Sequence, residues 1–234
     1  MKTNIIPALD GLDIDEARRL VGQLHGRCYA FKIHDLFDRR GGVAIDALAA
    51  GGARIWVDVK LHDIPATVAG RAGMITSLGA DIITVHASGG IAMMEAAVKA
   101  TQTCGTEIYA ITLLTSLSPE YIAKRFKNGE NPSMVVLDLA RDAKKAGVHG
   151  VVCSPQEVGL LSRQEDLAGM KFIVPGVRSP GADQHDQQRT GTPRQAFADG
   201  ASAIVVGRQI TQAEDPVAAF DALVAEITAE EVAS

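Results

Sequence analysis

Three charged residues interrupt an apolar, strand-like run at 56–65, where the sequence reads WVDVKLHDIP. The charged residues are Asp58, Lys60 and Asp63. Burying an ionised side chain costs free energy unless the charge is paired or used. Because alternate residues of a strand point to the same face, Asp58 and Lys60 share a face and Val57 and Val59 share the other. The run therefore predicts a buried strand that presents a carboxylate and an ammonium side by side near its end.

The two preceding strand-like runs, 4–10 and 28–34, also carry charges near their ends. In the first run Ile6, Ala8 and Asp10 share a face, and in the second Lys32 lies on the face of Ala30 and His34. Parallel neighbouring strands end at the same edge of a sheet. We therefore expect a cluster of charges at one rim, with Asp63 just beyond it: Asp10, Lys32, Asp58 and Lys60.

Such an array of ammonium and carboxylate groups is close to neutral and suits a particular kind of reaction. A carboxylate placed against a substrate anion raises the energy of the bound substrate if that anion is lost during the reaction. A neighbouring ammonium can stabilise a developing carbanion and then give it a proton. The array thus favours loss of a carboxylate followed by protonation at carbon, and it requires no metal. A salt bridge that merely caps the strands is the alternative interpretation.

Eight short β-rich runs position these groups, and a helical pattern follows each of them. The order and length predict an α/β fold, a (β/α)8 TIM barrel forming a single domain over residues 1–234. An open doubly wound sheet is the alternative, but no glycine-rich dinucleotide turn follows the first run. The eight runs are 4–10, 28–34, 54–61, 81–88, 107–116, 149–154, 171–177 and 202–208.

The last quarter of the chain resembles an anion site. The eighth run ends in Gly207 and Arg208, where glycine would let backbone amides approach a phosphate and arginine would supply a forked donor. Arg178 begins the long polar loop 175–193, and loops after strands seven and eight of such barrels commonly bind phosphate. The alternative is that both arginines are solvated surface residues.

Composition limits the function classes. The 234 residues are 47% hydrophobic with a net charge of -5 and no basic stripe, which argues against a nucleic-acid partner. No run approaches the ~20 apolar residues of a membrane span, and the N-terminus lacks a signal-peptide core. Cys28, Cys104 and Cys153 are widely spaced, so we expect buried thiols in a reducing compartment. We therefore expect a cytoplasmic protein without a metal or other cofactor.

Several motifs together resemble the orotidine 5′-phosphate decarboxylase family. The segment DVKLHDIPATV (58–68) is similar to that family's Asp-x-Lys-x-x-Asp-Ile-Pro signature. The resemblance continues through PALD, FKI, TVHASGG, LTS, VPGVR, DQQR and VVGRQIT in this order along the chain. Asp-x-Lys-x-x-Asp alone is shared with sugar-phosphate relatives, whereas the ordered combination is specific.

The resemblance implies a metal-free, homodimeric barrel that converts orotidine 5′-monophosphate to uridine 5′-monophosphate. It implies that Asp58 faces the departing carboxylate and that Lys60 stabilises and protonates the carbanion. Asp63 and Thr67 would act across the dimer interface. The full set that it implies is a catalytic tetrad of Lys32, Asp58, Lys60 and Asp63, and substrate-binding residues Asp10, Thr67, Thr115, Pro175, Arg178, Gln187, Gly207 and Arg208.

Two positions depart from the family pattern. His34 stands where glycine usually follows the FKI segment, and Ala66 stands where asparagine often precedes Thr67. These departures concern the backbone after the second strand and a ribose or interface contact, and they leave the charged tetrad intact. Two other functions remain open: a Mg²⁺-dependent sugar-phosphate aldolase and a non-catalytic nucleotide-binding barrel.

Overall fold

Eight parallel strands form one sheet in the computed structural model, which describes residues 3–125, 131–180 and 189–229. The strand order is β1-β8-β7-β6-β5-β4-β3-β2, so consecutive strands from β2 to β8 pair with one another and β1 pairs with β8. The strands are β1 (Ile5–Pro7), β2 (Phe31–Ile33), β3 (Ile55–Leu61), β4 (Ile82–His86), β5 (Glu107–Ile111), β6 (Gly150–Val152), β7 (Lys171–Val174) and β8 (Ala203–Val206).

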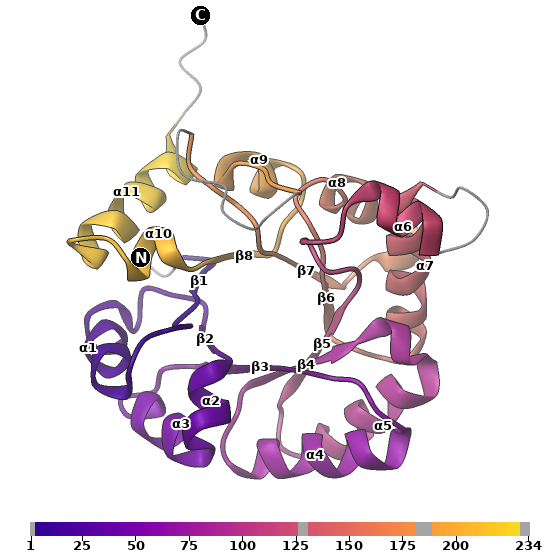
Figure 1. Ribbon diagram of the computed structural model, residues 1–234, viewed down its shortest axis with the longest axis horizontal. Coiled ribbons are helices and arrows are strands. Elements are labelled where there is room, and N and C mark those ends of the chain that lie inside the picture. Colours follow the sequence, from indigo (N-terminus) through magenta and orange to yellow (C-terminus); the bar gives the residue numbers. More distant parts are fainter. Residues whose placement is uncertain (1–2, 126–130, 181–188, 230–234) are drawn as a thin grey trace, which may run out of the picture.

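The sheet closes between its first and second strands. Ala8 and Lys32 form an isolated parallel bridge, and the amide of Leu9 donates to the carbonyl of Lys32 at 2.9 Å. Figure 1 shows the eight strands as a ring with the helices outside it. The predicted (β/α)8 barrel is therefore confirmed, and the open doubly wound sheet is excluded.

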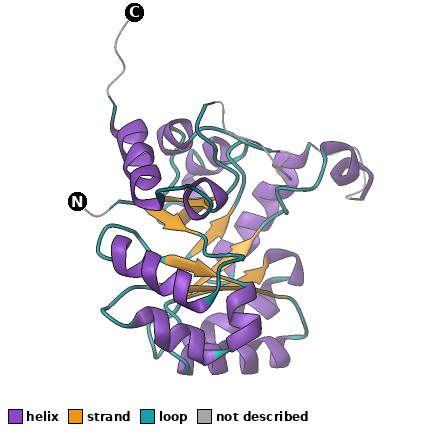
Figure 2. Ribbon diagram, turned by 60° about the vertical axis from the view of Figure 1, so that its left-hand side comes forward, coloured by secondary structure: helices purple, strands orange, loops and turns teal. Residues whose placement is uncertain are grey.

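Helices surround the strands, as the purple and orange ribbons of Figure 2 show. Their starts follow capping chemistry: Asp13 and Glu16 form a capping box at α1, and Asp215 accepts two backbone amides at α11. The α-helices are α1 (Ile14–Leu24), α2 (Asp35–Arg40), α3 (Gly42–Ala49), α4 (Pro65–Ser77), α5 (Ile91–Thr101), α6 (Pro119–Arg125), α7 (Pro132–Lys145), α8 (Val158–Ser162), α9 (Pro193–Ala198), α10 (Arg208–Thr211) and α11 (Pro216–Thr228), with 3₁₀ turns η1 (Ala87–Gly89) and η2 (Glu165–Leu167).

The side chains of the strands separate into two apolar cores, as their alternation predicts. The larger core lies between strands and helices and includes Ile55, Val57 and Leu61 of β3. The smaller core fills the barrel interior and includes Trp56 and, from β1, Ile6. The inward direction predicted for Trp56 and Asp58 therefore follows from the pleat of β3.

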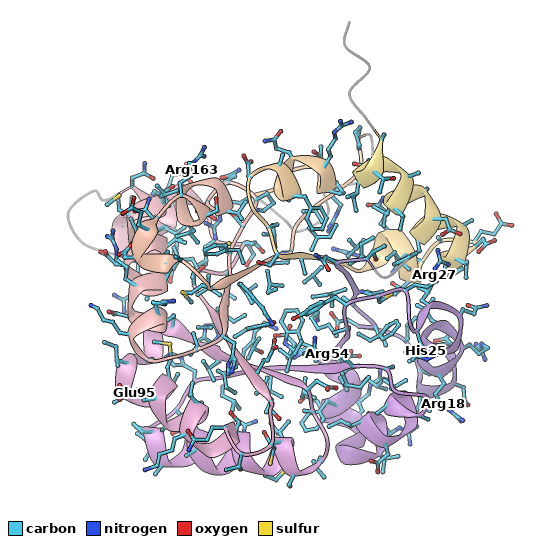
Figure 3. All side chains as sticks on the ribbon, turned by 180° about the vertical axis from the view of Figure 1, so that it is seen from behind. Arg18, His25, Arg27, Arg54, Glu95 and Arg163 are labelled. Atoms are coloured by element: carbon cyan, nitrogen blue, oxygen red, sulfur yellow. The ribbon has the colours of Figure 1, made fainter. Side chains whose placement is uncertain are left out.

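A polar cluster closes the amino-terminal end of the barrel. Lys171 donates to Glu107 at 2.7 Å and to the hydroxyl of Tyr29 at 3.0 Å, and Tyr29 lies 3.1 Å from the hydroxyl of Tyr109. Arg54 stacks over the ring of Tyr29 at 4.8 Å and lies near the middle of the ring in the rear view of Figure 3. A site for substrate must therefore open at the opposite, carboxyl-terminal end.

Two expectations need correction. Most of the strands are shorter than their apolar runs, because several runs continue into the loops that follow the sheet, as β5 does after Ile111. Cys104 is exposed rather than buried, since it lies in the surface turn between α5 and β5, whereas Cys28 and Cys153 are buried as expected. Within the described ranges, no helix has the length and apolar character needed to cross a bilayer.

Candidate active site

A cavity of about 590 Å³ opens at the carboxyl ends of the strands. That size lies within the usual range for small-molecule sites. Trp56, at the inner end of β3, contributes to its apolar lining and meets Tyr109 edge to face at 6.0 Å between ring centroids. The cavity gathers nine of the predicted site residues: Asp10, Lys32, Asp58, Lys60, Thr115, Pro175, Arg178, Gly207 and Arg208.

Asp58 is the hub of the charged cluster. Its Oδ2 accepts a hydrogen bond from Nζ of Lys60 at 2.7 Å and lies 3.2 Å from Nζ of Lys32. Its Oδ1 accepts from the hydroxyl of Thr84 at 2.7 Å. Lys32 also donates to Oδ2 of Asp10 at 2.7 Å. Two carboxylates and two ammoniums from β2, β3 and the loop after β1 thus form one continuous network.

The network keeps these buried groups ionised. Burial alone would raise the pKa of Asp58, but Lys32, Lys60 and the Thr84 hydroxyl outweigh it and lower that pKa to about 2. Burial likewise opposes the charge of Lys32, yet Asp58 and Asp10 raise its pKa above the ordinary value. Near neutral pH, Asp58 is therefore a carboxylate and Lys32 an ammonium, although both side chains are buried.

Lys60 has an unusual backbone conformation. Its φ of 47° lies in the left-handed region, and it is the only non-glycine with positive φ among the described residues. The pairing of β3 with β4 shifts register between Val57 and Leu61, which marks a bulge at this point. The amide of Lys60 donates to Oγ1 of Thr84 at 3.0 Å, so one threonine holds both the carboxylate and the bulged backbone. Strain of this kind persists where surrounding contacts over-determine the geometry.

The opposite side of the cavity carries the predicted anion site. Arg178 follows β7, and Arg208 follows β8, directly after Gly207. The backbone amide of Arg178 donates to the carbonyl of Gly191 at 2.9 Å, which fixes where its side chain begins. A Cβ at Gly207 would meet Ala8 no closer than 3.7 Å, so packing within the protein does not require glycine there. Close approach of a ligand to that backbone stays a prediction.

Three predicted site residues are not part of this cavity as described. Asp63 and Thr67 are exposed, on the turn after β3 and in the first turn of α4, and neither lines the cavity. Oδ1 of Asp63 accepts a hydrogen bond from the amide of Ile64 at 2.7 Å. Gln187 lies outside the described residues. The cavity of one chain therefore contains three of the four predicted catalytic residues.

The structure accounts for one of the two departures. His34 lies at the start of α2, and its Nδ1 lies 2.6 Å from the carbonyl oxygen of Asp58. Since a carbonyl only accepts, Nδ1 carries the proton, and the imidazole ties the end of β2 to β3. Ala66 is exposed in the first turn of α4, away from the cavity.

Comparison with known proteins identifies the family. The family model described as "Orotidine 5'-phosphate decarboxylase / HUMPS family" matches residues 3–223. The chain belongs to this family. A protein named orotidine 5′-phosphate decarboxylase from Moorella thermoacetica is 39% identical over 97% of this chain and 92% of its own length. Another of that name, from Halorhodospira halophila, is 41% identical over 96% of each chain.

Solved structures agree with the family assignment. A crystal structure titled as orotidine 5′-phosphate decarboxylase from Lactobacillus acidophilus superposes with a TM-score of 0.80 and 34% identity, covering 96% of this chain and 99% of that one. An uncharacterised conserved protein from Geobacillus kaustophilus superposes with a TM-score of 0.79 and 29% identity, covering 96% and 100%. The comparisons therefore agree with the barrel fold, and several of the similar proteins have a named activity.

The sequence left a Mg²⁺-dependent sugar-phosphate aldolase as an alternative function, which would require a metal site. Among the described residues, no three or more His, Cys, Asp or Glu side chains gather in a way that could hold a metal ion. In the charged cluster, each carboxylate instead contacts an ammonium: Asp10 contacts Lys32, and Asp58 contacts Lys32 and Lys60.

Proposed function

We propose that this protein decarboxylates orotidine 5′-monophosphate to uridine 5′-monophosphate, a step of pyrimidine biosynthesis, without a metal ion. The observation that carries the proposal is the Lys32–Asp58–Lys60 network inside a nucleotide-sized cavity. The names of the relatives support the same activity.

The charges of the network suit the bond that breaks. In the proposed complex the carboxylate on C6 of the pyrimidine lies against the ionised Asp58, and this repulsion raises the energy of the bound substrate. When the C6–carboxylate bond breaks, carbon dioxide leaves and the electron pair stays on C6. Lys60, 2.7 Å from Asp58, stabilises that carbanion and gives C6 a proton, which the amine later regains from solvent.

The remaining cavity residues would bind the rest of the nucleotide. Lys32 and Asp10 would contact the ribose hydroxyls while Lys32 keeps Asp58 ionised. Thr115 would hold the edge of the pyrimidine, with Pro175 against the base. The phosphate would bind on the opposite side, where two arginines meet a glycine backbone, through Arg178, Gly207 and Arg208, joined by Gln187.

The active unit is proposed to be a homodimer. Asp63 and Thr67 are exposed on consecutive turns beyond the catalytic strand, with the side chain of Ile64 also 66% exposed between them. If a second copy packs on this surface, Asp63 and Thr67 of the first copy would reach the cavity of the second. Asp63 would there complete the tetrad with Lys32, Asp58 and Lys60 of the second copy. The proposal includes a cytoplasmic location, because a biosynthetic nucleotide substrate is found there, and no nucleic-acid or membrane partner.

One assay separates the three candidate functions. The loss of orotidylate absorbance is followed with purified protein, with and without EDTA. Decarboxylation that EDTA leaves unchanged supports the proposal. Activity that disappears with EDTA, together with Mg²⁺-dependent aldol chemistry on a sugar phosphate, would support the aldolase. Tight binding of uridine 5′-monophosphate with no consumption of orotidylate would support a non-catalytic barrel.

A further inference from the structure

A buried ion pair lies outside the charged cluster and has no role in the steps above. The guanidinium of Arg189 contacts the carboxylate of Glu157, and each residue is 2% exposed. Charged side chains are rarely buried to this extent unless they are paired. Neither residue lines the cavity, so the pair does not touch the proposed substrate directly.

The pair joins the loops that follow β5 and β6. One terminal nitrogen of Arg189 donates to the carbonyl oxygens of Leu113 at 3.3 Å and Leu114 at 3.0 Å, just after β5. Glu157 accepts hydrogen bonds from the amide of Ser154, at 3.1 Å, and from its hydroxyl, just after β6. Both loops line the cavity, through Leu113, Leu114, Thr115 and Ser116 on one side and Cys153 on the other.

The pair also anchors the chain that returns from the loop after β7. Two residues beyond Arg189, Gly191 bridges to Val177 and accepts the amide of Arg178 at 2.9 Å. Gly191 lies close against Pro155, where an added Cβ would approach the proline ring to 2.6 Å. The segment that Arg189 fixes thus holds the backbone of Arg178, the arginine proposed to bind the anion.

Stability is a weak explanation for this pair. Taking two charges out of water costs about as much as their attraction returns, and apolar residues of similar volume are often as stable. The Nε of Arg189 is buried and has no hydrogen-bond partner within the described residues, so the guanidinium is not fully satisfied. What the pair provides that apolar residues would not is a fixed geometry for the carbonyls of Leu113 and Leu114.

We propose that Arg189 and Glu157 are positioning residues that hold Thr115 and Arg178 in the arrangement that binds the nucleotide. The inference rests on the proposed function for the identity of that ligand. Without the pair, the loops that carry Thr115 and Arg178 would sample other arrangements. Only a fraction of the molecules would then be able to bind the nucleotide, and the apparent affinity would be reduced in proportion to that fraction. The catalytic cluster comes from β2, β3, β4 and the loop after β1, so we expect its geometry to be unchanged.

The test is a double-mutant cycle with two independent readouts. Arg189→Met and Glu157→Met each leave one buried charge unpaired, so each is expected to lower the melting temperature. The double variant removes both charges and is expected to recover most of that loss. We expect its KM for orotidylate and its Kd for uridine 5′-monophosphate to stay raised at least ~10-fold, with kcat within ~3-fold of wild type.

Two further variants make the result decisive. Arg189→Lys keeps the charge but lacks the fork that contacts the Glu157 carboxylate with one nitrogen and the two carbonyls with the other. It should raise KM while remaining folded. Arg141→Met removes an exposed ion pair with Asp166 and should change neither constant. Wild-type KM and Kd in the double variant, or in Arg189→Lys if the double variant does not fold, would overturn the inference. Absence of turnover by the wild type would instead contradict the proposed function, and failure of the wild type to bind uridine 5′-monophosphate would contradict both.

Discussion

Lys60 donates a 2.7 Å hydrogen bond to Asp58 two residues earlier on the same strand, and it does so from a left-handed backbone conformation. In a regular strand, side chains two residues apart stand parallel and point the same way. The bulge at Lys60 turns its ammonium back onto the carboxylate. The two groups proposed to expel the substrate carboxylate and to protonate the product carbon are thus already in contact in the free protein.

Thr84 is predicted to control this contact. It is fully buried, donates to Asp58 and accepts the amide of Lys60. Thr84→Val replaces the hydroxyl with a methyl group of similar size and leaves both partners short of a hydrogen bond. We expect a loss of about 1–3 kcal/mol in the free energy of unfolding. Chemical denaturation measures it.

Thr84→Ser is the matched control because it keeps the hydroxyl. Thr84→Val should lose orotidylate turnover as well as stability. Thr84→Ser should retain most of that turnover. Equal stability and turnover in the valine and serine variants would show that the hydroxyl has no part in the cluster.

Acid should destabilise the protein through Asp58. Its pKa is about 2 in the folded protein against an ordinary value of 3.8. A carboxyl group whose pKa is lower in the folded than in the unfolded protein stabilises the fold. That contribution is fully present above the unfolded-state pKa and is lost as the pH falls through the folded-state pKa. The shift corresponds to about 2 kcal/mol, lost mainly between pH 4 and pH 2.

Asp58→Asn isolates this contribution from those of other carboxyl groups. The difference in unfolding free energy between wild type and variant, measured by urea denaturation, should change by about 2 kcal/mol from pH 5 to pH 2. Parallel pH curves for the two proteins would contradict the assigned pKa.

The left-handed conformation of Lys60 predicts an order of stability between two inactive variants. Lys60→Gly and Lys60→Ala both remove the ammonium, but only glycine adopts positive φ without strain. We expect the glycine variant to be the more stable because it avoids the backbone strain. The difference should be at most about 1 kcal/mol, since the greater entropy of glycine in the unfolded chain offsets part of that gain. Thermal unfolding of the pair provides the comparison, and a more stable alanine variant would argue against strain at this position.

Shared active sites predict recovery of activity in hybrid dimers. Asp63→Ala and Lys60→Ala chains should each be inactive alone. In a hybrid, one site has both substitutions, and the other has a wild-type Lys60 with a wild-type Asp63 from the second copy. Random reassembly of equal amounts should therefore restore roughly a quarter of wild-type turnover. If mixing restores no activity although hybrids form, Asp63 does not act across an interface.

Much of the site could be predicted from local sequence because it depends on strand alternation. The alternation of apolar and charged residues placed Asp58 and Lys32 inside the barrel, and both lie there. The bulge at Lys60 could not be predicted, since lysine gives no signal for positive φ. The two hydrogen bonds of Thr84 depend on the register between β3 and β4, which the sequence of one strand does not determine.

The buried ion pair illustrates the same limit at longer range. Ser154 and Glu157 have the spacing of a capping box, which is a local signal that sequence reasoning could have used. Their partner Arg189 follows 32 residues after Glu157 in a polar loop, where an arginine reads as a solvated side chain. Only the closure of the barrel brings the three together.

Turnover of orotidylate by Lys60→Ala is the most direct test of the central claim. The side chain of Lys60 is 31% exposed at the cavity, so the variant should fold with wild-type circular dichroism. We predict that it binds uridine 5′-monophosphate but consumes orotidylate at least ~1,000-fold more slowly, because it lacks both the stabilising charge and the proton donor. Wild-type turnover in the folded variant would contradict the assignment of Lys60 and the mechanism built on it.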